Sequence, residues 1–279
     1  MRIISARKIR DIVSDLCIQA NLVLRKDVLL ALKTAYLKEK DKKAKDILGA
    51  IIKNARIARR EKLAICQDTG LPCVFVEMGQ DLKVGGDLKS AINKGVELGY
   101  KKGFLRNSVV KEPLLRGEAG YQPGIIHIDT VGGNKLKITV LPKGFGCENK
   151  TQLKMFNPTA KLDEIKKFII DAVKSAGPDA CPPYVVGVGI GGTVDYACFL
   201  AKKALLRELK AYSLKLTATA KLEKDLLSEI NKLNIGPMGL GGKTTALGLN
   251  LLTYPTHIAG LPVAVNISCH ALRSATKIL

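Results

Sequence analysis

The stretch LAICQDTGLPC (residues 63–73) places a thiol, an amide and a carboxylate side by side at Cys66, Gln67 and Asp68. A Thr-Gly turn pair and a second cysteine follow. Such a thiol can serve redox chemistry, form half of a disulfide or bind a metal, and the carboxylate beside it can move a proton. Most single cysteines, however, are small buried apolar residues. The rest of the chain has to decide between these interpretations.

The cysteine count argues against a disulfide framework. The chain has 279 residues and seven cysteines, an odd number at long spacings with no CxxC pair, whereas secreted disulfide scaffolds are shorter and denser in cysteine. The N-terminus is charged, with no apolar signal-peptide core and no run of about 18 apolar residues that could span a membrane. We therefore expect a reducing, cytoplasmic setting and no membrane partner, in which scattered cysteines can ligate a metal or cluster.

The net charge of +20, from 45 basic and 25 acidic residues, raises the question of nucleic-acid binding. Much of the excess is lysine on stretches expected to be helical, such as residues 38–46 and 55–62, with few aromatic residues to stack on bases. A solvated basic face, or a surface for an acidic partner or substrate, is the favoured interpretation.

Apolar periodicity predicts a helical N-terminal part, residues 1–62, and a mixed α/β remainder, residues 63–279. Residues 1–62 contain three helical stripes. Further helices are expected at residues 86–103, 161–177, 195–209 and 220–233, and strands at 72–79, 184–192 and 258–268. Residues 124–131 and 135–142 flank the turn GGN and predict a β-hairpin. Without a strict βαβ alternation, we expect one α/β (mixed α+β) domain over residues 1–279, with two lobes.

Four loops carry more chemistry than their surroundings: CQDTG (66–70), KGFGCENK (143–150), CPPYVVGVGIGGT (181–193) and THIAGLPVAVNISCHALR (256–273). Their glycines let backbone amides approach an anion, although each loop can also be only a tight turn. GLGGKTT (239–245) fails as a P-loop because Pro237 stands where the first glycine is required. GVGIGG fails as a dinucleotide loop because the stretch about 20 residues on, RELKAY (207–212), is expected to be helical rather than a strand end.

Together these segments resemble the iron–sulfur (class I) fumarate hydratases. They are most similar to the separate alpha subunit of the two-subunit fumarate hydratases and L-tartrate dehydratases. The matching segments occur in the family's order over roughly residues 10 to 275: ICQDTG, PKGFG followed by EN, CPPYVVGVGIGGT, IGPMGLGGKTT and LPVAVNISCHALR. Any one of them alone would be weak, and the set of five is specific.

The resemblance implies a 4Fe–4S cluster held by Cys66, Cys181 and Cys269, with one iron left without a protein ligand. An open iron is a Lewis acid, unlike the fully ligated irons of an electron carrier. The cluster site would lie between the two lobes. We expect Cys17, Cys73 and Cys198 in the core. The family usually carries serine at Cys147, which we expect on the loop or the substrate side and not among the ligands.

The resemblance also assigns roles around a dicarboxylate substrate. Asp68 would protonate the departing hydroxide, although it can instead be a turn residue only. Substrate contacts would come from Gln67, Arg106, His257 and the backbone amide of Gly146. Further cations near the motifs cannot be ranked from the sequence: Arg116, Lys150, Lys243 and Arg273.

The implied function is the reversible hydration of fumarate to malate by an alpha subunit, with L-tartrate dehydration as the alternative. In the single-chain enzymes a C-terminal domain brings further arginines, a lysine and a threonine, a candidate for the carbon-proton base, whereas this chain ends at Leu279. We therefore expect a beta subunit to complete the site, in an assembly with two copies of each. A non-catalytic metal-binding protein and a basic nucleic-acid binder remain as alternatives, and a salt-dependent gel-shift assay separates the latter.

Overall fold

The computed structural model describes residues 2–209 and 218–279, so residues 210–212 of the expected helical stretch RELKAY lie outside the described residues. The chain divides into two compact units. Unit 1 comprises Met1–Arg25, Ala55–Phe145 and Arg273–Leu279, and unit 2 comprises Lys26–Asn54 and Gly146–Leu272. The helical N-terminal part, residues 1–62, contributes to both units.

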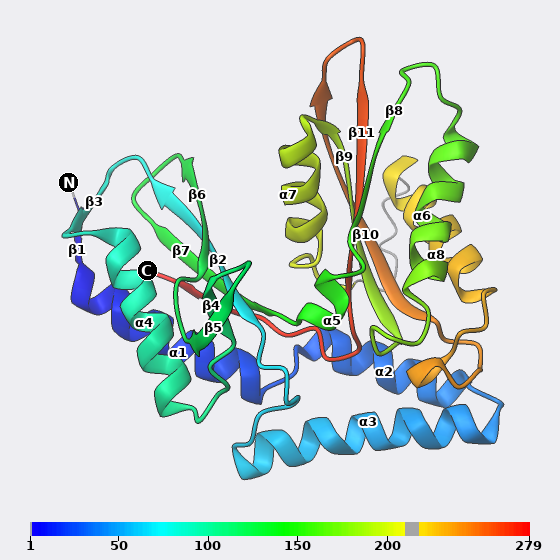
Figure 1. Cartoon of the computed structure of the whole chain (residues 1–279), viewed down its shortest axis with the longest axis horizontal. Helices are drawn as coiled ribbons and strands as arrows, with labels where there is room; N and C mark the ends of the chain where they lie inside the picture. The colour runs from blue at the N-terminus through cyan, green and yellow to red at the C-terminus, as the bar shows by residue number, and fades with distance from the viewer. Residues whose placement is uncertain (1, 210–217) are drawn as a thin grey trace. The chain divides into compact units, whose positions relative to one another are not determined.

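Unit 1 packs two helices, α1 (Ala6–Leu22) and α4 (Leu88–Lys102), against a four-stranded sheet (Figure 1). The sheet order is β12 (Ala275–Ile278), β7 (Leu136–Lys143), β2 (Leu71–Gly79) and β6 (Ile125–Val131). The apolar stripe of α1 lies in the core together with β2, β7 and α4. The two helices approach so closely that a Cβ on Gly99 would lie 2.6 Å from the Ser14 carbonyl oxygen, which places the next residue, Tyr100, deep in the core.

The β-hairpin expected from residues 124–131 and 135–142 is wrong. The two strands form as β6 and β7, but β2 lies between them, parallel to β6 and antiparallel to β7. The GGN turn spans the end of β2, where the Gly79 N–H donates to the Lys135 carbonyl (2.8 Å) and the Gln80 N–H to the Val131 carbonyl (2.9 Å). Most of β2 is buried, so it takes a central position that local turn chemistry cannot reveal.

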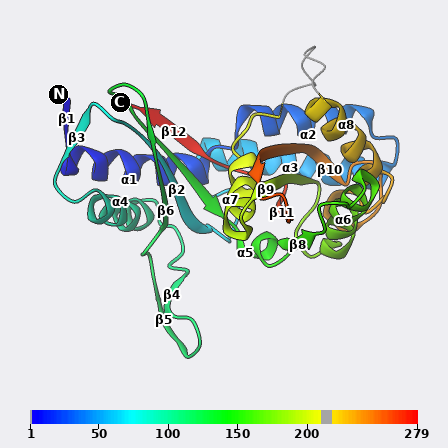
Figure 2. The same ribbon diagram turned by 90° about the horizontal axis from the view of Figure 1, so that it is seen from above.

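Two short pairs of strands complete unit 1. The parallel pair is β1 (Arg2–Ser5) with β3 (Leu82–Gly85), and the antiparallel pair is β4 (Val109–Glu112) with β5 (Arg116–Gly120). The β4–β5 hairpin extends away from the helices and sheet of this unit (Figure 2). Its tip exposes Leu114 (88%) and Leu115 (87%), so it gains little stability from burial within the chain.

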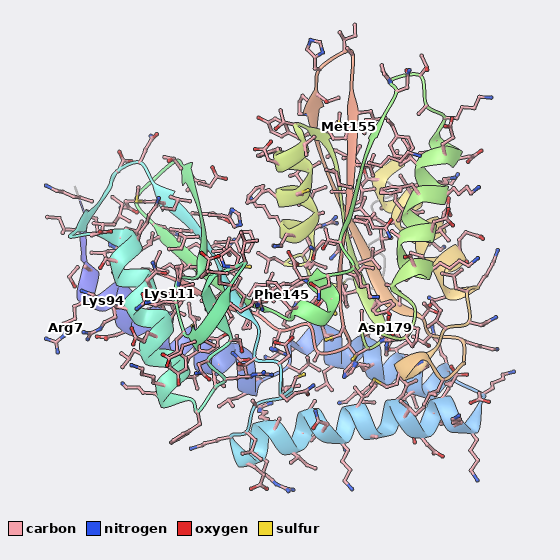
Figure 3. The ribbon with its side chains drawn as sticks, viewed as in Figure 1. Arg7, Lys94, Lys111, Phe145, Met155 and Asp179 are labelled. Atoms are coloured by element: carbon pink, nitrogen blue, oxygen red, sulfur yellow. The ribbon has the colours of Figure 1, made fainter. Side chains whose placement is uncertain are left out.

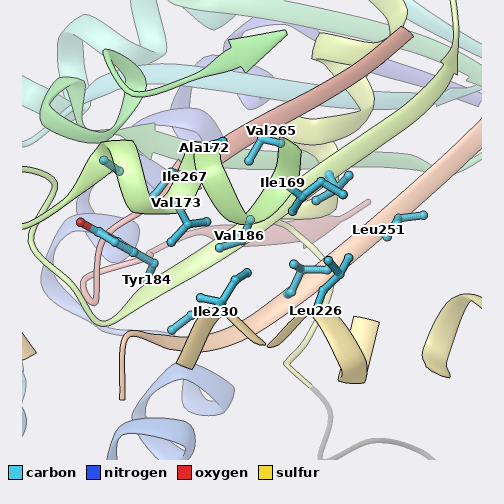
Figure 4. Close-up of a cluster of buried hydrophobic side chains, with 14 of the residues drawn as sticks. Ile169, Ala172, Val173, Tyr184, Val186, Leu226, Ile230, Leu251, Val265 and Ile267 are labelled. Carbon is cyan, nitrogen blue, oxygen red and sulfur yellow. The ribbon is translucent and has the colours of Figure 1, made fainter. Parts of the chain in front are cut away.

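Unit 2 is a three-layer α/β/α arrangement (Figure 1). Its sheet order is β10 (Ala246–Thr256), β9 (Tyr184–Gly192), β11 (Leu261–Ser268) and β8 (Gln152–Phe156). Helix α7 (Val194–Ala204) covers one face, and α6 (Leu162–Ala176) and α8 (Ala218–Asn231) cover the other (Figure 4). The unit also contains α2 (Lys26–Lys38), α5 (Phe145–Glu148) from Gly146 on, and the short 3-10 helix η1 (Pro237–Gly239), while α3 (Lys42–Glu61) contributes residues to both units.

The first two glycines of GVGIGG serve helix packing. A Cβ on Gly187 would lie 2.1 Å from the Ala201 carbonyl oxygen, and one on Gly189 would lie 2.1 Å from that of Ala197. Helix α7 therefore rests directly on the backbone of β9, which any larger side chain would prevent. The glycine spacing reflects this contact.

The mixed α+β class is confirmed, and so are the three N-terminal helices and the strand over residues 184–192. The sequence analysis missed β10 and took the strand ending at Ser268 as the last one, whereas β12 follows it. Helix α7 ends at Ala204, earlier than the expected residue 209. Among the described residues, no helix has the length and apolar character needed to cross a membrane.

Candidate functional site

The loop Cys66–Gly70 in unit 1 is held through three consecutive backbone carbonyls. The single proton of the Tyr100 hydroxyl is shared between the carbonyls of Thr69 (2.7 Å) and Gly70 (3.1 Å). The Arg273 guanidinium donates to the carbonyl of Asp68. Both donors are buried, at 1% and 3% exposure, so they hold the loop backbone from the core side, while Cys66, Gln67 and Asp68 stay partly or fully exposed.

The Asp68 carboxylate is oriented by two backbone N–H groups. Oδ1 accepts from Gly70 (2.9 Å), and Oδ2 accepts from Phe145 (2.8 Å), the first residue of α5 (Figure 3). Gly70 has φ +74°, and a Cβ there would lie 2.7 Å from the Pro142 carbonyl carbon, so glycine is required for this turn. The carboxylate is therefore held in one direction and not left to rotate freely.

Cys66, Gln67 and Arg106 lie with Asp68 at this loop. The Cys66 thiol is partly exposed and donates to Gln67 Oε1 (3.3 Å). The Arg106 N–H donates to the Thr69 hydroxyl (3.1 Å), which fixes its backbone beside the loop while the residue as a whole is exposed. Unit 1 thus brings together four of the residues singled out in the sequence.

Unit 2 brings Cys181 and Cys269 to one end of its sheet. Cys181 lies three residues before the start of β9, and Cys269 directly follows β11. The His270 N–H donates to the Cys181 carbonyl (3.3 Å), so the segment that enters β9 and the segment that leaves β11 are in contact. Cys181 has φ 55°, in the left-handed region that few non-glycine residues adopt. Both cysteines are partly exposed.

Cys147 belongs to this end of unit 2 and is buried (5% exposure) in the short helix α5, whereas the sequence suggested a loop or substrate-side position. Its thiol donates to the Ala180 carbonyl (3.2 Å), next to Cys181. The same helix is anchored by Glu148, which accepts from Lys202 (2.5 Å) and Asn266 (3.0 Å). Gly146 in α5 is exposed beside these contacts.

His257 lies elsewhere in unit 2. It is exposed in the turn between β10 and β11, where its Nδ1 accepts from the Ala259 N–H (3.1 Å). Because β9 and β10 run parallel and β11 returns, this turn and Cys269 are at opposite ends of β11. That strand has eight residues, so the separation is about 25 Å. Within unit 2 the structure therefore does not bring His257 to Cys181 and Cys269.

The unranked cations have separate surroundings. Lys150 pairs with Asp179 (2.9 Å), and Arg116 is exposed in the β4–β5 hairpin. The Lys243 N–H donates to the buried carboxylate of Glu39 (2.9 Å). A backbone N–H of the GLGGKTT loop thus binds a carboxylate of the protein itself. This agrees with the failure of the P-loop pattern. Arg273 is the one in contact with the loop of Cys66 and Asp68.

The sequence analysis missed Tyr100 altogether. In the sequence, Tyr100 is an aromatic residue near the end of a helix that the glycine at residue 103 terminates. An ordinary core residue has the same pattern.

The donor set fits an iron–sulfur group. All seven cysteines are thiols outside any disulfide. Cys66, Cys181 and Cys269 are partly exposed at loop positions, whereas Cys17 and Cys73 are buried in the core as expected. Cys198 is partly buried and packs against Ala197, Ala201 and Ala264. Within residues 2–209 and 218–279, no group of three or more His, Cys, Asp or Glu side chains gathers as a metal site. The three candidate ligands come from both units.

Comparison with known proteins identifies relatives over nearly the full chain. A family model described as "Fumarate hydratase (Fumerase)" matches residues 10–277. The chain is 41% identical over 278 residues to the Methanocaldococcus jannaschii protein named "Putative L(+)-tartrate dehydratase subunit alpha", with 97% of each chain covered. It is 29% identical over 279 residues to the "L(+)-tartrate dehydratase subunit alpha" of Escherichia coli K12, covering 99% of this chain and 92% of that protein.

The rate at which each cysteine thiol reacts should depend on its burial in the structure. Burial raises the pKa of the Cys17 thiol to about 12, and only the thiolate is alkylated. In the folded chain without a bound cluster, iodoacetamide at pH 8 should label Cys66 at least about 10-fold faster than Cys17. Peptide mapping by mass spectrometry measures both rates, with the urea-unfolded chain as control. Equal rates in the folded chain would contradict the environments described.

Proposed function

Because the chain belongs to the fumarate hydratase family, we propose that it is the alpha subunit of an iron–sulfur hydro-lyase that hydrates fumarate reversibly to malate. The observation that carries this proposal is the loop Cys66–Gly70. It presents a thiol, an amide and a carboxylate together from a backbone held by buried donors. The Arg106 backbone is tied to the same loop.

We assign a 4Fe–4S cluster to Cys66, Cys181 and Cys269. The donor chemistry supports this assignment, since three partly exposed thiols leave one iron of such a cluster without a protein ligand. When bound, the cluster would supply a Lewis acid that polarises the carbon–oxygen bond of the substrate hydroxyl. Cys147 is not assigned as a ligand, because its thiol is buried and donates to the Ala180 carbonyl.

Asp68 is assigned the proton transfer to the leaving hydroxide. Its two N–H donors, Gly70 and Phe145, fix the direction of the carboxylate while each oxygen keeps a lone pair for the proton. In the hydration direction the same carboxylate would take a proton from the attacking water. A fixed carboxylate avoids the loss in rate that a mobile one would bring.

The remaining chain residues are assigned to the substrate carboxylates. The planar guanidinium of Arg106 can bind a carboxylate through two parallel hydrogen bonds. Gln67 can donate from its amide without adding charge, and Gly146 can donate its backbone N–H. A substrate with two negative charges calls for more cations than Arg106 alone, so we propose that a beta subunit supplies them together with the group that removes the carbon proton. The "subunit alpha" names of the relatives support such a partner.

L-tartrate dehydration is the second candidate, and the names of the relatives favour it. Both substrates are four-carbon dicarboxylates, and both dehydrations remove a hydroxyl next to a carboxylate. The residues of this chain serve either substrate, because the contacts assigned here involve the carboxylates and the leaving hydroxyl.

The test is anaerobic co-purification of the chain with its beta subunit, followed by iron and sulfide analysis and assays with fumarate and with L-tartrate. We expect fumarate hydration that depends on both chains. Cys181→Ser should lose the cluster and the activity, whereas the matched Cys198→Ser should keep both. Activity on L-tartrate alone would select the second candidate. Full iron content in Cys181→Ser would overturn the ligand assignment.

Asp68→Asn should lower kcat by on the order of 10²-fold or more with a smaller effect on KM, because the amide cannot deliver the proton. The amide nitrogen also cannot accept an N–H, so one of the two hydrogen bonds is lost. Thermal unfolding measured in parallel separates that structural loss from the chemical one. Asp81→Asn, at an exposed turn of unit 1, is the matched control. A wild-type kcat in Asp68→Asn would leave Asp68 a turn residue only.

His257 can contact a substrate held at Cys181 and Cys269 only from a second copy of the chain, since these residues lie at opposite ends of β11. Mixing His257→Ala with Cys181→Ser subunits tests this. Each variant alone should be inactive or nearly so, and hybrids that carry one copy of each should regain activity at one site. No recovery on mixing, or wild-type activity of His257→Ala alone, would remove His257 from the substrate contacts.

A further inference from the structure

Two buried side chains reach the loop Cys66–Gly70 from beneath. Tyr100 comes from α4, and Arg273 comes from the segment before β12, four residues after Cys269 in the sequence. Between them they donate to the carbonyls of three successive residues, Asp68, Thr69 and Gly70. The turn does not need these side-chain donors in order to form. A local Asx turn, in which the Asp68 carboxylate accepts the Gly70 N–H, already closes it.

Tyr100 is suited to hold this backbone permanently. Its ring is packed in the unit 1 core, and the contact of Gly99 with Ser14 brings α4 against α1 at this point. Burial raises the pKa of the Tyr100 hydroxyl far above its usual range, so the group stays protonated and remains a donor. Without it, the Thr69 and Gly70 carbonyls would lose a donor in a buried place, which costs more than a surface hydrogen bond.

Arg273 is a cation with 3% exposure, a costly arrangement unless its donors are used. One of its terminal nitrogens donates to the Asp68 carbonyl. Its Nε is buried and has no hydrogen-bond partner among the described residues. A buried guanidinium with only part of its donors engaged is not explained by stability, because a well-packed apolar side chain would cost less there.

We propose that Tyr100 and Arg273 are positioning residues that act through the loop. By fixing the carbonyls of Asp68, Thr69 and Gly70 they set the directions of the Cys66, Gln67 and Asp68 side chains, which project from the same short backbone. They also set the place of Arg106, whose backbone hydrogen-bonds to the Thr69 hydroxyl. The catalytic consequence rests on the proposed function, whereas the effect on the loop does not.

Three backbone N–H groups can report on the arrangement of the loop. The N–H groups of Gly70, Arg106 and Phe145 are each bonded to a loop side chain, namely Asp68 Oδ1, Thr69 Oγ1 and Asp68 Oδ2. Their hydrogen exchange measures whether the loop keeps this arrangement, with no need for activity or a bound cluster. Loss of a local hydrogen-bond set speeds exchange there and leaves amides of other elements unchanged.

The experiment compares Tyr100→Phe and Arg273→Lys with two control variants, all in the full-length chain. Tyr36→Phe makes the same change at a tyrosine of α2 in unit 2. Arg207→Lys disturbs an arginine that also donates to a backbone carbonyl, that of Leu251 (2.9 Å), in unit 2. Hydrogen exchange is followed by NMR or mass spectrometry, and kcat, KM and thermal unfolding are measured on the anaerobic complex with the beta subunit.

We expect exchange of the three reporter amides to accelerate at least about 10-fold in Tyr100→Phe and Arg273→Lys but not in the controls. We expect kcat to fall by about 10- to 10²-fold with KM within about threefold, since displaced catalytic groups slow the chemical step. Unchanged reporter exchange in both variants would overturn the proposal. The proposal would also be overturned if Arg207→Lys and Arg273→Lys lowered Tm equally and lowered kcat equally. A wild-type complex without hydro-lyase activity would refute the proposed function, and the exchange data alone would then decide on the loop.

Discussion

The hydrogen bonding of one short turn governs the candidate site. Buried side chains donate hydrogen bonds to the carbonyls of Asp68, Thr69 and Gly70. The Asp68 carboxylate in turn accepts the N–H of the first residue of α5. The turn is thereby tied to α4, to the end of β7 and to the segment before β12. A side chain presented from such a backbone keeps its direction, which proton transfer and metal ligation both require.

In unit 2 as well, hydrogen bonds to backbone carbonyls hold the segment that carries a candidate cysteine ligand. The Cys147 thiol donates to the Ala180 carbonyl, and the His270 N–H donates to that of Cys181, so the segment entering β9 is held at two successive carbonyls. The buried Tyr184 hydroxyl donates to the Gly177 carbonyl just upstream. In both units, then, the backbone that carries the candidate site residues is held by hydrogen bonds from other segments of the same unit.

The sequence predicted the residues that lie in contiguous motifs and failed where long-range packing decides. Cys66, Asp68 and Arg106 could be chosen as candidates because the chemistry of their side chains is visible in short segments. Tyr100 could not, because a buried aromatic residue on a helix has the same pattern whether or not its hydroxyl reaches a distant turn. The β6–β7 hairpin failed for a related reason: β2, from far earlier in the chain, occupies the place between the strands. The position of His257 likewise depends on sheet register, which no motif records.

The proposed function depends on a 4Fe–4S cluster held by Cys66, Cys181 and Cys269, with one iron open to substrate. Mössbauer spectroscopy of the anaerobic, iron-57-labelled complex, before and after adding fumarate or L-tartrate, tests it most directly. We expect the signal of one iron in the cluster to change on addition of the substrate while the signals of the other three stay the same. A cluster whose irons all remain unchanged with either substrate, or the absence of a cluster from the active complex, would contradict it.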